Sequence, residues 1–235
     1  MMHTNITVSD LEIMTGAINY RDWMYHRLAP FIGQRILEVG AGIGNFTSLL
    51  LDRQLIVAVD TYAPCVAQLR TRLSDAPNVV ALHLDIADAG TDQLGHYGFD
   101  TVICLNVLEH IEDDCRALSN MHAVLEPGGR LVLLVPAFQF LYGTVDRSLQ
   151  HYRRYTRKDL LPKIASTGFD VDKTFYMNMV GMAGWFLNNR VLKRGEESPK
   201  QILTFDRWVA PWADRVERLV PPPFGLSLIA ICRKP

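Results

Sequence analysis

Short apolar runs alternate with amphipathic segments through residue 135 of the chain. Such runs, bounded by turn-forming residues, are typical of strands that are buried on both faces of a sheet. The segments between them repeat apolar residues at helical spacing, as Leu118, Met121 and Leu125 do. Strands and helices in this alternation predict a parallel sheet covered on both faces. The predicted strands are 36–39, 55–59, 78–84, 99–105 and 130–135, and the predicted helices are 45–53, 64–73 and 113–125.

The second half of the chain has a less regular pattern. A helix is predicted over 156–167, with Thr156 as its N-cap and Gly168 as its stop. Two further strands are predicted over 169–176 and 226–232. These two strands would complete the sheet that the first half begins.

Two segments of this half are expected to form a cap. Residues 136–158 follow the fifth predicted strand, and residues 177–224 separate the last two strands. Connections of this length are often functional lids. The second segment holds three of the four tryptophans, which is more aromatic area than a connecting loop requires. We therefore predict a single domain over residues 1–235 in which these two segments cap the binding site.

The most informative segment is the glycine-rich turn after the first predicted strand. Its glycines stand at Gly40, Gly42 and Gly44, a GxGxG spacing that differs from the GxGxxG of dinucleotide sites. Glycines at such a turn let the backbone approach a ligand closely. Glu38 stands two residues earlier, where its charge would repel a pyrophosphate and attract a ligand with cationic groups. S-adenosyl-L-methionine (SAM), which carries an ammonium and a sulfonium, is such a ligand.

Five motifs at predicted strand ends carry a resemblance to a known family. In chain order they are 38–44, Asp60, Asp85-Ile86, 106–110 and 125–129. With these motifs the chain resembles a class I SAM-dependent methyltransferase. The resemblance implies an α/β fold with a Rossmann-like, doubly wound sheet of seven strands. That sheet would be mostly parallel with an antiparallel last strand, and the cofactor would be SAM.

The resemblance also implies which residues bind SAM. Asp60 would accept hydrogen bonds from both ribose hydroxyls, Asp85 would contact adenine, and Asn106 would lie under the methionine moiety. Asp85 could instead form only a turn, and Asn106 could act through its backbone alone. The expected cofactor-binding residues are Glu38, Gly40, Gly42, Gly44, Asp60, Thr61, Asp85, Ile86 and Asn106.

Two histidines are candidate catalytic residues. His110 follows the fourth predicted strand, beside the methyl group of the implied cofactor, and could take a proton from an attacking hydroxyl. His151 is the other candidate base, and a purely structural role for His110 stays open. The acidic run 109–114 does not predict a metal site, because consecutive residues at a helix start point in different directions. Asp113 and Asp114 are better explained as favourable charges at a helix N-terminus.

The stretch 146–155 interleaves arginines with tyrosines and a histidine. It follows the fifth predicted strand, so it should lie at the rim of the active-site mouth, where arginine forks suit a carboxylate or phosphate. We therefore expect this stretch to bind a small acceptor that could carry an anionic group. The alternative is a solvated helix start with aromatic packing. The expected substrate-binding residues are Tyr142, Tyr152, Arg153, Arg154, Tyr155 and Trp185.

Composition excludes several other classes of function. The formal net charge of -1 gives no support for binding to nucleic acid or to a membrane surface. No apolar stretch is long enough to span a bilayer, and no signal peptide is predicted. The four cysteines form no CxxC pair, which is typical of core thiols in a reducing compartment such as the cytoplasm.

Together these features predict a SAM-dependent methyltransferase that acts on an oxygen, in a hydroxyl or carboxylate, of a small molecule. N- or C-methylation of a small molecule is the alternative reaction. A non-catalytic SAM-binding regulatory subunit is the alternative class of protein. An NAD(P) oxidoreductase is disfavoured by the GxGxG spacing and by Glu38.

Overall fold

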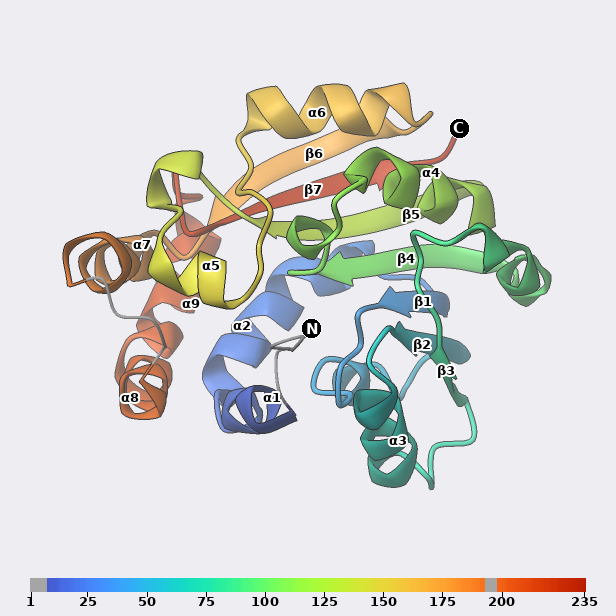
Figure 1. Cartoon of the computed structure of the whole chain (residues 1–235), viewed down its shortest axis with the longest axis horizontal. Coiled ribbons are helices and arrows are strands. Elements are labelled where there is room, and N and C mark those ends of the chain that lie inside the picture. The colour runs from blue at the N-terminus through green and yellow to red at the C-terminus, as the bar shows by residue number, and fades with distance from the viewer. Residues whose placement is uncertain (1–7, 193–197) are drawn as a thin grey trace.

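The fold is built around one seven-stranded sheet (Figure 1). The computed structural model describes residues 8–192 and 198–235. The strand order is β3-β2-β1-β4-β5-β7-β6, and among these strands only β7 runs antiparallel to its neighbours. This order confirms the predicted α/β fold with a mostly parallel sheet. The strands are β1 Arg35–Val39, β2 Leu55–Asp60, β3 Val79–His83, β4 Phe99–Leu105, β5 Leu125–Pro136, β6 Asp170–Met177 and β7 Ser227–Arg233.

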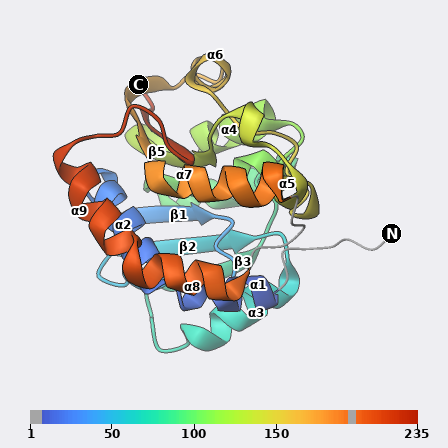
Figure 2. The ribbon, with the colours of Figure 1, turned by 90° about the vertical axis from the view of Figure 1, so that its left-hand side faces the viewer.

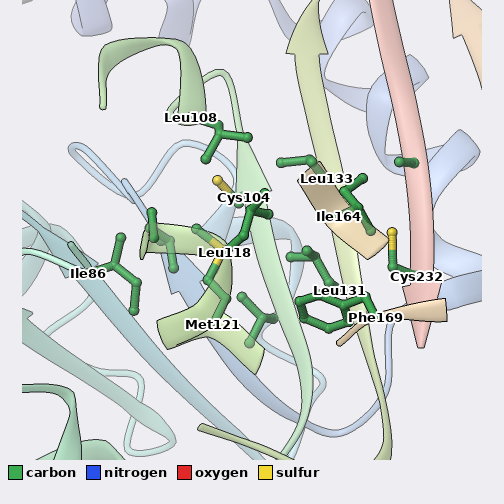
Figure 3. Packing of buried hydrophobic residues seen from close by; sticks show 14 of the residues in the cluster. Ile86, Cys104, Leu108, Leu118, Met121, Leu131, Leu133, Ile164, Phe169 and Cys232 are labelled. Atoms are coloured by element: carbon green, nitrogen blue, oxygen red, sulfur yellow. The ribbon is translucent and has the colours of Figure 1, made fainter. Parts of the chain in front are cut away.

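One face of the sheet carries the larger core. Successive residues of a strand point to opposite faces, so each apolar strand supplies side chains to both sides. On this face the strands pack against α4 (Asp114–Val124) and α6 (Arg157–Ser166). Figure 3 shows Met121 of α4 and Ile164 of α6 beside the strand side chains, among them Leu131 of β5. These helices are the two that the periodicity predicts at 113–125 and 156–167.

The opposite face is covered by helices from the two ends of the chain. Here α2 (Ile18–Leu28) and α9 (Ala210–Leu219) pack against strand residues such as Ile36. Trp23 of α2 is fully buried in this core. The pattern of residues did not predict α2, because its sequence INYRDWMYHRL carries few aliphatic residues. The core on this face is therefore closed by segments that lie far apart in the sequence.

The helix predicted over 45–53 is wrong. After the glycine turn the chain forms only a short 3-10 turn at Thr47–Leu49. The Ser48 N–H still donates to the Gly44 carbonyl at 3.1 Å, as in an α-helix. The next N–H groups, of Leu49 and Leu50, donate three residues back instead, which is the 3-10 pattern.

Helices gather at the carboxyl edge of the parallel strands, and in Figure 2 the arrows of β1 and β2 point toward the side on which α1 and α5 lie. This is the edge at which open α/β sheets bind ligands. The short helix α1 (Val8–Thr15) lies on the glycine turn, where the Asn45 side-chain amide donates to the Leu11 carbonyl at 2.9 Å. On the other side of the same edge lie α5 (Thr144–Ser148) and α7 (Met179–Phe186).

The predicted cap segment 177–224 divides into two parts. Its first part contains α7 at the carboxyl edge. Its second part contains α8 (Pro199–Trp208) and α9, which pack on α2. The Asp206 carboxylate of α8 accepts hydrogen bonds from the Asn19 side chain at 3.0 Å and from the Tyr20 N–H at 2.7 Å. This second part therefore covers the sheet and supports α2.

The remaining elements connect these layers. The helix α3 (Ala63–Arg72) packs beside β2 and β3. The cysteines are free thiols, and Cys65, Cys104 and Cys232 are buried, as predicted for core residues. No helix in the described part of the chain is both long enough and apolar enough to cross a membrane. The short helical turns are Ala29–Phe31, Ala89–Tyr97, Leu108–His110, Gln139–Leu141 and Leu187–Val191.

Candidate active site

The glycine turn is packed so closely that it has no room for side chains. Gly40 and Gly42 have φ values of +73° and +55°, which side chains other than glycine rarely adopt. A Cβ at Gly40 would lie 2.2 Å from the side chain of Val107, which follows β4. A Cβ at Gly42 would lie 2.9 Å from the side chain of Leu11 in α1. The turn is thus enclosed by the end of β4 on one side and by α1 on the other.

Asp60 ties the glycine turn to the end of β2. One carboxylate oxygen accepts from the Gly42 N–H at 2.7 Å, and the other accepts from the Tyr62 N–H at 2.8 Å. Each carboxylate oxygen has lone pairs for a further hydrogen bond. Asp60 can therefore hold the turn and bind a ligand hydroxyl at the same time.

A pocket of about 440 Å³ opens beside the ends of β2 and β3. Two expected cofactor-binding residues, Thr61 and Asp85, line it. Asp85 also accepts from the Ala87 N–H at 2.8 Å, so it does form the turn that was its alternative role. Ile86 is buried below the pocket, and its carbonyl accepts from the Asn120 side chain at 2.7 Å. The full lining is Thr61, His83, Leu84, Asp85, Asp88 and Gln93.

Glu38 is buried in β1, just before the glycine turn. Only 4% of the residue is exposed, and its Oε2 atom has no hydrogen-bond partner among the described residues. Burial, with a smaller contribution from the charge of Asp60, raises the pKa of Glu38 to about 7. A buried carboxyl without a partner is costly, and a cationic group would offset that cost.

The chain turns sharply at the end of β4. Asn106 has a φ of +53°, in the left-handed region that asparagine tolerates better than most residues. Its N–H donates to the Leu134 carbonyl at 2.8 Å, and its side chain is exposed. This turn presses Val107 against Gly40 and places Glu109 and His110 next along the chain.

The two candidate catalytic histidines lie side by side. The ring centroids of His110 and His151 are 4.5 Å apart, in an edge-to-face arrangement. The Tyr152 N–H donates to the Glu109 carbonyl at 2.8 Å and so joins the two segments. Burial and the neighbouring His151 lower the pKa of His110 to about 4, so His110 is neutral at neutral pH. Residues that are 41 positions apart in sequence thus form one cluster.

Asp146 organises the segment that carries His151. Its Oδ1 atom lies 3.0 Å from His151 Nδ1 and 2.7 Å from Arg154 Nε, and its Oδ2 atom accepts from the Asn189 side chain at 3.0 Å. Burial alone would raise the pKa of Asp146, but the hydrogen bond from His151 and the charge of Arg154 lower it to about 2. Arg154 is 3% exposed and stacks on Trp185, with 4.5 Å from Cζ to the ring centroid.

The second arginine and its neighbouring tyrosine are also held inside the chain. Arg153 forms an ion pair of 2.7 Å with Asp114, and the Tyr155 hydroxyl donates to the same carboxylate at 3.0 Å. Tyr155 is 1% exposed. Asp114 is itself buried and also binds Lys163 at 2.7 Å, whereas Asp113 caps α4 as predicted. Asp114 is therefore more than a charge at a helix start.

Three of the expected substrate-binding residues are paired within the chain. Arg153, Arg154 and Tyr155 bind carboxylates of the chain itself, so their geometry gives no support for an anionic acceptor. The Tyr142 hydroxyl is also used internally, since it donates to the His151 carbonyl at 2.7 Å. Tyr152, in contrast, remains half exposed. Trp185 is partly exposed and donates through its indole N–H to the Leu141 carbonyl at 3.3 Å.

Replacement of Arg154 by glutamine is expected to destabilise the fold by roughly 3–5 kcal/mol, because it leaves the buried Asp146 charge without its cationic partner. Arg153→Gln is the matched control and should cost at most about 1 kcal/mol, since this ion pair is partly exposed and Asp114 keeps Lys163. Urea unfolding of both variants measures the difference. Equal losses in the two variants would show that Asp146 does not depend on Arg154.

Comparisons with known proteins agree with this geometry. A family model described as a methyltransferase domain matches residues 37–131. An uncharacterized methyltransferase of Mycobacterium tuberculosis is 36% identical over 114 residues, which are 48% of this chain and 56% of that protein. A ubiquinone biosynthesis O-methyltransferase of Albidiferax ferrireducens is 25% identical over 151 residues, which are 58% of this chain and 59% of that protein. The N-methyltransferase NodS of Bradyrhizobium japonicum, solved with S-adenosyl-L-homocysteine, has a TM-score of 0.58 at 16% identity, covering 92% of this chain and 85% of that one.

The matched region 37–131 contains the glycine turn, Asp60, Asp85 and the end of β4. This region matches the methyltransferase domain family, and the fold of the chain is similar to that of class I SAM-dependent methyltransferases. The chain spans little more than half the length of the relatives that it matches in sequence.

The residues at this edge of the sheet fit SAM, the cofactor of methyltransferases with this fold. The unpaired buried oxygen of Glu38 suits a cationic group. Asp60 has lone pairs left for the ribose hydroxyls. The pocket with Thr61 and Asp85 would take the adenine.

Asp60→Ala is expected to weaken SAM binding by about 1.5–3 kcal/mol, through the lost hydrogen bonds to the ribose hydroxyls. Asp52→Ala, at an exposed carboxylate, serves as the control and should leave affinity unchanged. Calorimetric titration with SAM measures both variants. Wild-type affinity in a folded Asp60→Ala protein would remove this assignment.

The sequence did not identify the roles of three residues of the site. Leu11 covers the glycine turn from a helix that the pattern did not predict. Asp146 and Glu109 lie in the segments 146–155 and 106–110, but nothing in those segments distinguishes them from the neighbouring polar residues. Their burial depends on which segments meet in the fold, so no local pattern could have identified them.

Proposed function

We propose that this chain transfers a methyl group from SAM to an oxygen of a small-molecule acceptor. The observation that carries the proposal is the pair His110 and His151, in which His110 follows β4 and comes three residues after Val107, the residue packed on Gly40. When bound, SAM supplies a methyl group activated by the sulfonium. What the chain must add is alignment of the acceptor, exclusion of water and control of the acceptor's proton.

The histidine pair is suited to an acceptor that must lose a proton. His110 is neutral at neutral pH, and the contact between Asp146 and His151 Nδ1 orients that ring so that Nε2 points away from the carboxylate. We propose that these two histidines activate an acceptor hydroxyl. They do so either as the general base or by holding a group that lowers the pKa of the hydroxyl. A carboxylate acceptor would not need this pair.

The acceptor site is proposed to lie under 136–158 and α7. Aromatic side chains with exposed surface there are Tyr152, Trp185, Phe140 and Phe186, whereas the hydroxyls of Tyr142 and Tyr155 are bound within the chain. We regard α8 and α9 as support for α2 instead of as part of the roof. The acceptor is proposed to be a small molecule, since the net charge of -1 offers no general attraction for nucleic acid.

A screen of acceptors tests the proposal. The purified chain with SAM is offered hydroxylated, carboxylated and amine compounds, and release of S-adenosylhomocysteine is measured. Mass spectrometry of the product then locates the new methyl group. Methylation of a hydroxyl is the expected result, whereas methylation at nitrogen or carbon would favour the alternative reactions. SAM binding with no turnover on any acceptor would favour a regulatory subunit.

A further inference from the structure

Glu109 is a buried carboxylate that the proposed function does not use. The residue has no exposed surface, and neither carboxylate oxygen has a hydrogen-bond partner in the described part of the chain. The nearby charge of Arg154 is already engaged by Asp146 at 2.7 Å. A polar group left this way in the interior is costly and calls for an explanation.

The unpaired carboxylate belongs to a cluster with the two histidines. One ligand atom each from Glu109, His110 and His151 can be chosen so that all three lie within 4.8 Å of one another. The residues reach this arrangement from two segments, which the bond from the Tyr152 N–H to the Glu109 carbonyl holds together. His151 is the member that the sequence could not associate with the acidic run at 109–114.

Both imidazoles have one nitrogen occupied and one left over. His151 Nδ1 lies 3.0 Å from the Asp146 carboxylate, and His110 hydrogen-bonds the backbone of Leu149. Histidines that bind metals almost always donate their second N–H to a carboxylate or a backbone carbonyl, which fixes the tautomer and the orientation of the ring. The chain supplies one partner of each kind.

We propose that Glu109, His110 and His151 bind one divalent transition-metal ion, such as Zn²⁺ or Mn²⁺. Two imidazoles and one carboxylate suit first-row ions better than Mg²⁺ or Ca²⁺, which take mainly oxygen ligands. Bonds of about 2.0–2.2 Å require the three ligand atoms to draw together by small side-chain rotations. Three protein ligands leave coordination positions open, as in catalytic metal sites.

The role of this ion rests on the proposed function. An ion at the histidine pair would lower the pKa of an acceptor hydroxyl, so that the hydroxyl proton goes to solvent. The freed oxygen electron pair then forms the bond to the methyl carbon, and the electron pair of the broken C–S bond stays on sulfur. His110 and His151 would then act as ligands, and no separate general base is required.

Metal binding by the chain alone tests the site. The protein is treated with EDTA and dialysed against Zn²⁺ or Mn²⁺, and the bound metal is counted by mass spectrometry. We expect one equivalent in the wild type and an affinity at least about 100-fold lower in Glu109→Gln, which keeps the shape and removes the charge. The metal affinity of Asp146→Asn should be about 10–100-fold lower, which is the usual effect of removing the hydrogen-bond partner of a metal ligand. His96→Ala, at an exposed histidine outside the cluster, is the control and should bind like the wild type.

The melting temperature distinguishes a lost metal site from a misfolded variant. Metal should raise the melting temperature of the wild type and of His96→Ala but not that of Glu109→Gln, because only a native site gains stability from its ligand. Should Glu109→Gln fail to fold, His151→Gln takes its place. Equal metal binding by the wild type and the folded variant, or no bound metal in the wild type, would overturn the proposal. Neither assay uses SAM or an acceptor, so the outcome is independent of whether methyl transfer is found.

Discussion

Gly42→Val is expected to abolish SAM binding while the chain still folds. Gly42 has a φ of +55°, where a β-branched side chain is strained, and its added atoms would meet Leu11 of α1. Its N–H is also the donor that Asp60 accepts at 2.7 Å, so a shifted turn would displace the carboxylate expected to bind ribose. One substitution therefore disturbs the turn, its covering helix and the end of β2 together.

Calorimetric titration with SAM and thermal unfolding measure the two sides of this prediction. The variant should show no measurable binding but a cooperative transition, because the two cores of the sheet do not involve the turn. Gly184→Val is the matched control, since a Cβ at Gly184 meets no atom within 4 Å. If Gly42→Val binds SAM with wild-type affinity, the cofactor site lies elsewhere.

Alanine at His151 or at His110 is expected to lower kcat by about 10²–10⁴, with the affinity for SAM close to that of the wild type. The two rings touch edge to face, and they belong to the same cluster as Glu109. Either loss therefore removes a group that handles the acceptor's proton, whether it acts as a base or as a ligand. The SAM residues on β1, β2 and the glycine turn are not altered, which is why the expected effect falls on turnover.

Single-turnover measurements with saturating SAM, together with titrations of SAM, separate the two effects. His96→Ala should retain full activity, because this histidine is exposed and lies outside the cluster. Full activity in both His110→Ala and His151→Ala would contradict the assignment. It would favour an acceptor that needs no deprotonation, such as a carboxylate.

The strands and the cofactor motifs could be predicted from the sequence alone. The limits of β1 to β4 agree with the apolar runs to within one residue at each end. Short apolar runs that end at turn residues encode a buried strand locally, without help from the rest of the chain. The motifs at strand ends follow from the same strands, because parallel strands bring their carboxyl ends to one edge. The resemblance to the family could therefore be stated before any contact was known.

Elements that depend on distant partners could not be predicted in this way. The chain after Gly44 has the composition of a helix, yet only Thr47–Leu49 turns helically, and Arg72 binds the Ile43 carbonyl and the Asn45 side chain beside it. Similarly, α2 is stabilised by Trp23 in a core that α9 completes from the other end of the chain. Neither partner is visible in a window of neighbouring residues.

The chemistry of the site was decided in the same way. The sequence by itself determined that arginines, histidines and acids occur between residues 106 and 155, but not which of them neutralise one another. In the tertiary structure Arg154 pairs with Asp146 and Arg153 pairs with Asp114, so neither guanidinium is left unpaired for an acceptor. The same fold left Glu109 without a partner and brought His151 to it. Charge pairing and burial are properties of atoms that meet in space, and the spacing of residues along a chain does not determine them.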